Sequence, residues 1–174
     1  MGLPITKVSD YSRGGSYSLP LNKLTIKEFT PYIEETEERW LCYLLGKELS
    51  DLFLSDLDPV TNLPVTPRFI EIYERFFKDS IRCSLKLESI GIKSFLQGLV
   101  CFYYLRSNNI SNGMMGAQSN DSENSIHEGL SRTQVIQLYN QSVETLKNIQ
   151  EFICDNMDTY PEFKGINKGY LTLI

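Results

Sequence analysis

One helix-length segment, from Ile92 to about Arg106, constrains the fold of this chain more than any other feature. Large apolar residues cover nearly its whole helical circumference: Phe95, Leu96, Leu99, Val100, Phe102, Tyr103 and Leu105. A surface helix carries one apolar stripe, so a helix that is apolar on almost every side must be buried by other elements. We therefore predict that this helix is the central element of the fold. Gly98, inside it, is expected to permit a close helix crossing.

The length and composition supply a core large enough to surround such a helix. The chain has 174 residues, of which 41% are hydrophobic and 22% charged, and it contains 9 Phe and 10 Tyr. These values are typical of one soluble globular domain and exclude a disordered chain, a collagen-like repeat and a disulfide-stapled miniprotein. The net charge of −5 lacks the positive field that attracts phosphate, so nucleic acid is a poor first choice of specific partner.

Two helices are expected before the central one begins. Thr30-Pro31 combines an N-cap residue with a proline at the first helical position, so the first helix is predicted to begin there. Its apolar stripe comprises Ile33, Trp40, Leu41, Leu44 and Leu45. Gly46 is the predicted glycine after its last turn, and a short second helix follows over Lys47–Leu54.

A connection with three prolines, Asp56–Pro67, leads to the next element. Thr66-Pro67 repeats the cap-and-proline pattern and predicts a helix to about Asp79. The predicted core face of that helix is Phe69 or Ile70, Tyr73, Phe76 and Phe77. Residues 81–90 alternate loosely between apolar and polar side chains, which indicates a short strand. A capping box at Ser131 and Gln134 begins the last helix, which is predicted to run to about Asn156.

The predicted fold class is mainly α, a helical bundle of four to five helices with two extended arms and one long polar loop. The N-terminal arm covers residues 1–24, the helical domain 25–156 and the C-terminal arm 157–174. The long loop is the segment 107–130, in which 13 of 24 residues are Ser, Asn or Gly. Loops of this length in a small domain are usually functional or disordered.

The cysteines and the single histidine indicate no metal site. Cys42, Cys83, Cys101 and Cys154 form no Cys-x-x-Cys pair, and His127 is the only histidine. Buried, reduced thiols are the favoured interpretation, which suits an intracellular compartment. The sequence has neither the ~18 uninterrupted apolar residues of a membrane span nor a signal-peptide core, so no membrane association is expected.

A search for catalytic chemistry finds no complete constellation. His127 lies in the most polar segment, where a preorganised base is not expected. The acidic run Glu34–Glu38 lacks the Glu-x-x-His pairs of helical di-metal sites. Asp56-Leu57-Asp58 begins like a calcium loop but lacks the required Gly and terminal Glu. We therefore expect no catalytic, cofactor or metal site, and a chain that is not an enzyme.

The charges are divided unevenly along the chain. Residues 31–60 contain eight acidic and two basic side chains, for a net charge of −6, whereas residues 61–106 contain seven basic and four acidic ones, for a net charge of +3. Random scatter over a solvated surface explains this as well as the alternative, in which unlike faces of neighbouring copies meet head to tail in a ring. The candidate interface residues for that ring are Glu34, Glu37, Glu38, Arg68, Arg75 and Lys78.

Two segments resemble head–tail connector proteins of tailed bacteriophages, in particular those of crAss-like phages of gut Bacteroidetes. The first is FTPYIEETEERWLCYLLGKELSDLF (Phe29–Phe53), in which Tyr32-Ile33, Leu41, Leu44-Leu45-Gly46 and Leu49 fall on the family pattern. The second is GIKSFLQGLVCFYYLRSNN (Gly91–Asn109), and a polar loop and a long final helix follow in the same order. The resemblance covers about Phe29 to Asn156, and its motifs are packing patterns. The N-terminal arm departs from the family pattern, as does Ile92, where the family usually has Leu.

The resemblance implies a structural virion protein, made in the host cytoplasm and located at the head–tail interface. Such connectors form rings, commonly of about twelve copies, that bind portal protein and the neighbouring connector or tail rings. The ring continues the DNA channel, and an acidic wall would let the genomic DNA slide. An alternative from the residues alone is a small intracellular helical adaptor that binds a partner helix or peptide.

Overall fold

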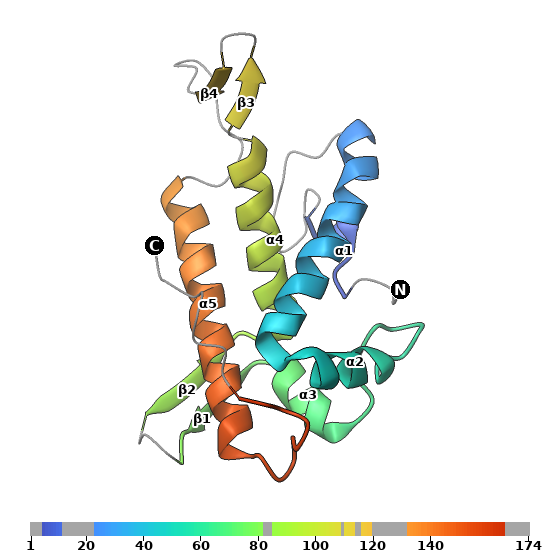
Figure 1. Cartoon of the computed structure of the whole chain (residues 1–174), viewed down its shortest axis with the longest axis vertical. Coiled ribbons are helices and arrows are strands. Elements are labelled where there is room, and N and C mark those ends of the chain that lie inside the picture. The colour runs from blue at the N-terminus through green and yellow to red at the C-terminus, as the bar shows by residue number, and fades with distance from the viewer. Residues whose placement is uncertain are drawn as a thin grey trace.

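The computed structural model describes residues 5–11, 23–81, 85–108, 110–113, 116–119 and 132–165. Over these residues the chain is mainly helical, and the predicted helical bundle is confirmed. The helices are α1 (Lys23–Leu45), α2 (Lys47–Ser55), α3 (Pro67–Tyr73), α4 (Ile92–Asn108) and α5 (Arg132–Asp155), preceded by a 3₁₀ turn, η1 (Val8–Tyr11). Two antiparallel hairpins join β1 (Phe76–Asp79) to β2 (Lys86–Ser89) and β3 (Ile110–Gly113) to β4 (Gly116–Ser119). The long helices α5, α4 and α1 stand side by side, and α2, α3 and the β1–β2 hairpin lie at one end of them (Figure 1).

The helix α4 is the central element, as predicted. Ile92, Phe95, Leu96, Leu99 and Val100 on it are all 0% exposed. It packs against α5 and α1 along its length and also contacts α3 and η1. The nearly continuous apolar surface of this segment is thus covered from several sides, which is the outcome that its composition requires.

The predicted close crossing at Gly98 is also confirmed. A Cβ atom built on Gly98 would lie 2.4 Å from the Oγ atom of Ser142 on α5 and 3.5 Å from the carbonyl oxygen of Leu138. The Ser142 hydroxyl donates a hydrogen bond of 2.8 Å to that same carbonyl. Small residues on both helices therefore allow α4 and α5 to approach closely at this point.

Two glycines occupy left-handed backbone conformations at helix boundaries. Gly46, with φ +75°, separates α1 from α2, and its N–H donates to the Cys42 carbonyl at 3.0 Å. Gly91, with φ +86°, precedes α4, and a Cβ atom there would lie 2.5 Å from the carbonyl oxygen of Tyr73. Both positions favour glycine for its backbone freedom, but only Gly91 is also in close contact with another backbone segment.

The predicted start of the first helix is wrong. Helix α1 begins at Lys23, so Pro31 lies inside it, where it supplies no N–H for the carbonyl four residues earlier. The apolar stripe explains the difference, because Phe29 and Ile33, on either side of Pro31, are each only 1% exposed. Burial of this continuous stripe outweighs the local preference of proline for a helix start.

The predicted end of the third helix is wrong as well. Helix α3 ends at Tyr73, and residues that were expected to continue it form β1, in which Phe76 pairs with Ser89 and Phe77 with Glu88. Phe76 is 7% exposed whereas Phe77 is 64% exposed, so adjacent side chains point to opposite faces. The segment has the two-residue period of a strand, and Phe77 does not belong to the core. The short strand expected within residues 81–90 is confirmed as β2.

Parts of both predicted arms belong to the core. Ile5 and Tyr11 are 2% and 0% exposed, and Tyr160 and Phe163 are 0% and 3% exposed. The Tyr160 hydroxyl also donates a hydrogen bond of 2.6 Å to the carbonyl of Arg68. Residues 23–24 of the predicted N-terminal arm are the first residues of α1, and residues 1–4, 12–22 and 166–174 lie outside the described residues.

The expected polar loop, residues 107–130, begins with the last residues of α4 and contains the β3–β4 hairpin. The rest of that loop, including His127, lies outside the described residues, as do Ser131 and Cys83.

Gly91→Ala is expected to destabilise the fold more than Gly46→Ala. Both changes put a side chain at positive φ, which costs on the order of 1–2 kcal/mol. Only Gly91→Ala also forces a methyl group against a backbone carbonyl, which adds on the order of 1–3 kcal/mol. Urea unfolding of the two variants measures the difference, and equal losses would show that the contact with Tyr73 is not a constraint.

Candidate interaction surfaces

The described residues contain no group of three or more His, Cys, Asp or Glu side chains that could hold a metal ion. Cys42, Cys101 and Cys154 form no disulfide bond, and the last two are buried. Burial raises the pKa of Cys101 to about 12, so this thiol stays protonated and unreactive at neutral pH. No helix in this part of the chain is long and apolar enough to cross a membrane.

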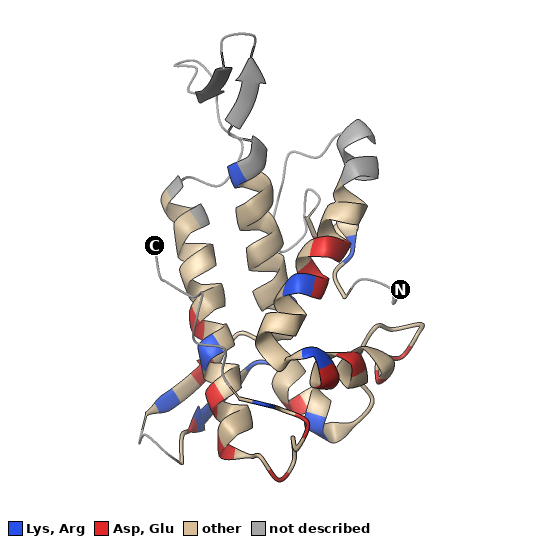
Figure 2. Cartoon of the chain, viewed as in Figure 1, with Lys and Arg blue, Asp and Glu red and all other residues tan. Residues whose placement is uncertain are grey.

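Figure 2 shows acidic positions of α1 in red. The three acidic residues of the predicted interface all lie on this helix but differ in exposure. Glu38 is exposed, Glu34 is half-buried and Glu37 is only 3% exposed. The prediction of Glu37 as an interface residue is wrong, because its side chain faces the interior of its own subunit. Its position follows from helical periodicity, since it lies four residues after Ile33 and four before Leu41 on the buried stripe.

The three basic residues of the predicted interface have acidic partners within the subunit. Arg68 on α3 pairs with Glu162 at 3.2 Å, and Arg75 pairs with Glu88 at 2.7 Å. Lys78 on β1 pairs with Glu71, and its Nζ atom lies 4.4 Å from the ring centroid of Phe152. No described ion pair or hydrogen bond links these three to the acidic residues of α1. A neighbouring copy would have to compete with the internal pairs.

Glu37 lies at the centre of a buried hydrogen-bond cluster. Its Oε2 atom accepts from the Ile5 N–H at 2.7 Å, and its Oε1 atom accepts from the Thr6 N–H at 2.9 Å and from the Thr6 hydroxyl. The Thr6 Oγ1 and Tyr11 hydroxyl oxygens are 2.9 Å apart. Burial outweighs these hydrogen bonds and raises the pKa of Glu37 to about 7. The cluster fixes residues 5–11 on the bundle.

The β1–β2 hairpin exposes three large apolar side chains, one on β1 and two near its tip, here called the hairpin surface. Phe77, Ile81 and Leu85 are 64%, 78% and 63% exposed. The residues that follow β1 are fixed to the end of α5, because the Ser80 hydroxyl and the Ile81 N–H each donate to Oδ2 of Asp155 at 2.9 Å. The structure thus holds these apolar residues in water in a defined conformation.

The connection between α2 and α3 exposes a second apolar group, here called the connection surface. Val60, Leu63 and Val65 are 83%, 49% and 64% exposed. A β-bridge between Leu57 and Pro64 closes the connection at its base.

Asp56 and Asp58 order this connection through their carboxylates. Oδ2 of Asp56 accepts from the backbone N–H groups of Val65 and Thr66 at 2.9 and 2.8 Å, and Oδ1 of Asp58 accepts from those of Val60 and Thr61 at 2.9 and 2.7 Å. Hydrogen bonds from Thr61 and Val60 lower the pKa of Asp58. Burial opposes ionisation of Asp56, but bonds from Thr66 and Val65 outweigh it and lower its pKa too. Both groups are therefore ionised at neutral pH and act as acceptors for the turn.

The β1–β2 hairpin and the α2–α3 connection, which carry the two surfaces, lie on opposite sides of the molecule at the same end of the bundle (Figure 1). Neither surface was predicted from the sequence. An apolar residue followed by polar residues gives no sign that it stays in water. The alternation of residues 81–90, extended back to Phe77, would place Phe77 on the same side as Leu87, which is 3% exposed. Ordered apolar residues that remain exposed in a subunit are typical of interaction sites.

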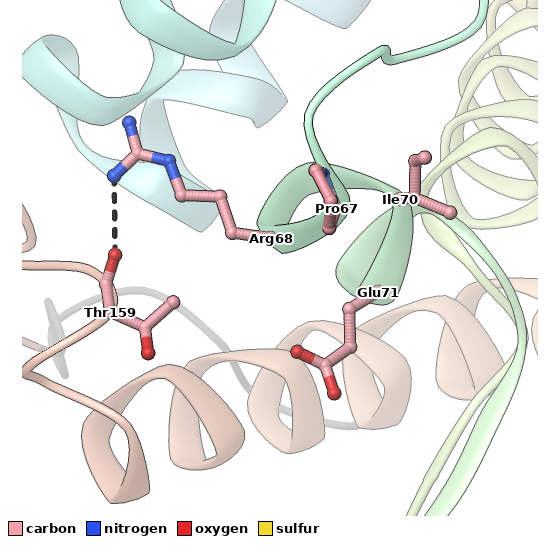
Figure 3. A pocket seen from close by; sticks show the side chains of 5 residues that line it. All are labelled: Pro67, Arg68, Ile70, Glu71 and Thr159. Carbon is pink, nitrogen blue, oxygen red and sulfur yellow. Dashed lines mark hydrogen bonds between the residues drawn. The ribbon is translucent and has the colours of Figure 1, made fainter.

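An open depression of about 520 Å³ lies between α3 and the turn after α5 (Figure 3). Its lining residues are Pro67, Arg68, Ile70, Glu71 and Thr159. Arg68 donates to the carbonyl of Thr159 at 3.2 Å and pairs with Glu162, while Glu71 pairs with Lys78. The charged groups of Arg68 and Glu71 are thus paired within the subunit, so we assign no ligand to the depression.

Comparison of the chain with protein-family models, with curated proteins and with solved structures gives no match.

Asp56→Ala is expected to destabilise the fold by about 1–3 kcal/mol, because it removes the acceptor for two backbone N–H groups and one hydroxyl. Asp51→Ala, which removes an exposed partner of Lys47 on α2, is the matched control and should leave the unfolding midpoint nearly unchanged. Urea unfolding measures both. A loss for Asp56→Ala no greater than that of the control would show that the carboxylate does not order the connection.

Proposed function

We propose that this chain is a structural subunit of a bacteriophage head–tail connector, forming a ring below the portal and continuing the DNA channel to the tail. The observation that carries the proposal is the presence of two ordered, exposed apolar surfaces on opposite sides of one subunit. The chain acts by assembly and carries out no catalysis, and its place is the virion.

The placement of the two surfaces favours a head-to-tail contact. A two-fold dimer uses one self-complementary patch, whereas two different patches on opposite sides join each copy to the next. The hairpin surface of one copy contacts the connection surface of its neighbour, and repetition closes a ring. Burial of Phe77 or Val60 at such a contact removes apolar area from water and stabilises the assembly.

The resemblance to connector proteins is compatible with this arrangement. Phe29–Phe53 corresponds to most of α1 and to α2, and Gly91–Asn109 corresponds to α4, so both resembling segments build the scaffold that supports the two surfaces. The net charge of −5 would keep the channel wall from binding DNA tightly.

The double variant Phe77→Ser/Leu85→Ser tests the proposal, with Met157→Ser as a control that changes an exposed apolar residue outside both surfaces. The wild-type chain is expected to form a ring, alone or on purified portal. The double variant should stay folded but weaken self-association at least ~10-fold, since each lost apolar contact contributes on the order of 1 kcal/mol. Light scattering after size-exclusion chromatography and native mass spectrometry measure the change.

The control variant should assemble like the wild type. A chain that stays monomeric at every concentration and does not bind portal would contradict the connector proposal and favour a small helical adaptor.

A further inference from the structure

The N-terminal segment, residues 5–11, is held on the bundle by one buried acidic side chain. The Glu37 carboxylate on α1 accepts hydrogen bonds from two consecutive backbone N–H groups, those of Ile5 and Thr6, at 2.7 and 2.9 Å. The Thr6 hydroxyl bridges Glu37 and the hydroxyl of Tyr11. Around these polar contacts, Ile5 and Tyr11 are buried, and the Tyr11 ring packs edge-on against Phe29 at 5.1 Å between centroids.

No lysine or arginine of the described residues forms an ion pair with Glu37. The nearby cation, Lys93 on α4, pairs with Asp10 of the same N-terminal segment at 3.2 Å. The Asp10 carboxylate also raises the pKa of Glu37. The other titratable groups nearby are Tyr11 in the segment, Tyr73 at the end of α3, and Glu34 and Glu38 on α1, while Cys101 on α4 acts on Tyr11. Burial raises the pKa values of Tyr11, Cys101 and Tyr73, so these three groups remain neutral between pH 5 and pH 8.

We propose that Glu37 is a protonation-controlled latch that holds the N-terminal segment against α1 and α4 more tightly when its carboxyl group is protonated. The proposal concerns a single subunit and does not depend on the function proposed above. It assigns a role to a buried acid that ring assembly does not use.

The hydrogen-bond geometry accommodates the proton. A protonated Glu37 can donate through Oε1 to the Thr6 hydroxyl, which then donates to the Tyr11 hydroxyl. Oε2 still accepts from Ile5 N–H, and Oε1 retains a lone pair for Thr6 N–H. Protonation therefore removes the cost of a buried charge while every hydrogen bond of the cluster is kept.

The sign of the pH effect follows from linkage. Release of the segment exposes the carboxyl group to water and returns its pKa from about 7 to the usual 4.5. Because the docked state has the higher pKa, docking is strongest at low pH and weakens as the pH rises through about 7. Between pH 5 and pH 8 the ratio of docked to released segment should fall by roughly 70-fold.

Hydrogen–deuterium exchange of the full chain, followed by mass spectrometry of peptides that cover residues 5–11, tests the proposal. After correction for intrinsic exchange, protection of these peptides should fall by roughly 70-fold from pH 5 to pH 8, while peptides from α4 and α5 stay protected. Glu37→Gln should abolish the pH dependence. Glu38→Gln, an exposed neighbour, and His127→Gln, which removes the only histidine, should both retain it.

A second variant covers the case in which Glu37→Gln fails to fold. Thr6→Val removes the bridging hydroxyl and keeps the carboxyl group, so it should lower protection at every pH and leave the pH dependence in place. Protection of residues 5–11 that is constant from pH 5 to pH 8 in the wild type, or that rises with pH, would overturn the proposal. So would a pH dependence that survives in folded Glu37→Gln or disappears in His127→Gln.

Discussion

Helix α4 presents almost no polar face to water, so the other elements are arranged to cover it. Helix α5 covers one side through the close approach at Gly98 and Ser142, and α1 covers another with the stripe that includes Ile33. Removal of each large apolar side chain from water contributes on the order of 1.5–3 kcal/mol, and α4 carries many of them. Even the N-terminal segment is recruited, because Tyr11 packs in a cluster with Val100 and Cys101.

Two kinds of exception to apolar burial are informative in this molecule, a buried acid and exposed large apolar residues. Glu37 is a charged residue type that is almost completely buried, and Phe77 is a large apolar residue that stays in water. The burial of Glu37 is explained within the subunit by the hydrogen bonds that its carboxylate accepts from backbone N–H groups. Phe77 stays 64% exposed although the Lys86 Nζ atom lies 5.3 Å from its ring centroid, which is why an interface is proposed there and at the connection surface.

Local patterns predicted the elements whose signals agree with their packing. Three features could be predicted from the sequence: the apolar segment of α4, the short helix α2 and the glycine at position 46. In each of them, composition, periodicity and backbone conformation favour the same structure. The prediction that the first helix starts at Pro31 was wrong, because tertiary burial of Phe29 and Ile33 outweighs the local preference of proline for a helix start. Phe76 and Phe77 fit a helix or a strand, and only the pairing with β2 decides between them. The hairpin and connection surfaces depend on which residues the assembled fold leaves uncovered, which no local pattern states.

In the proposed ring, one subunit binds the next through two different apolar surfaces. A cryo-electron microscopy reconstruction of the assembled protein, alone or on portal, would show which surfaces meet. We expect a closed ring in which the β1–β2 hairpin of each copy contacts the α2–α3 connection of its neighbour. A two-fold dimer that buries the same surface on both copies, or a ring in which Phe77 and Val60 both remain in solvent, would contradict it.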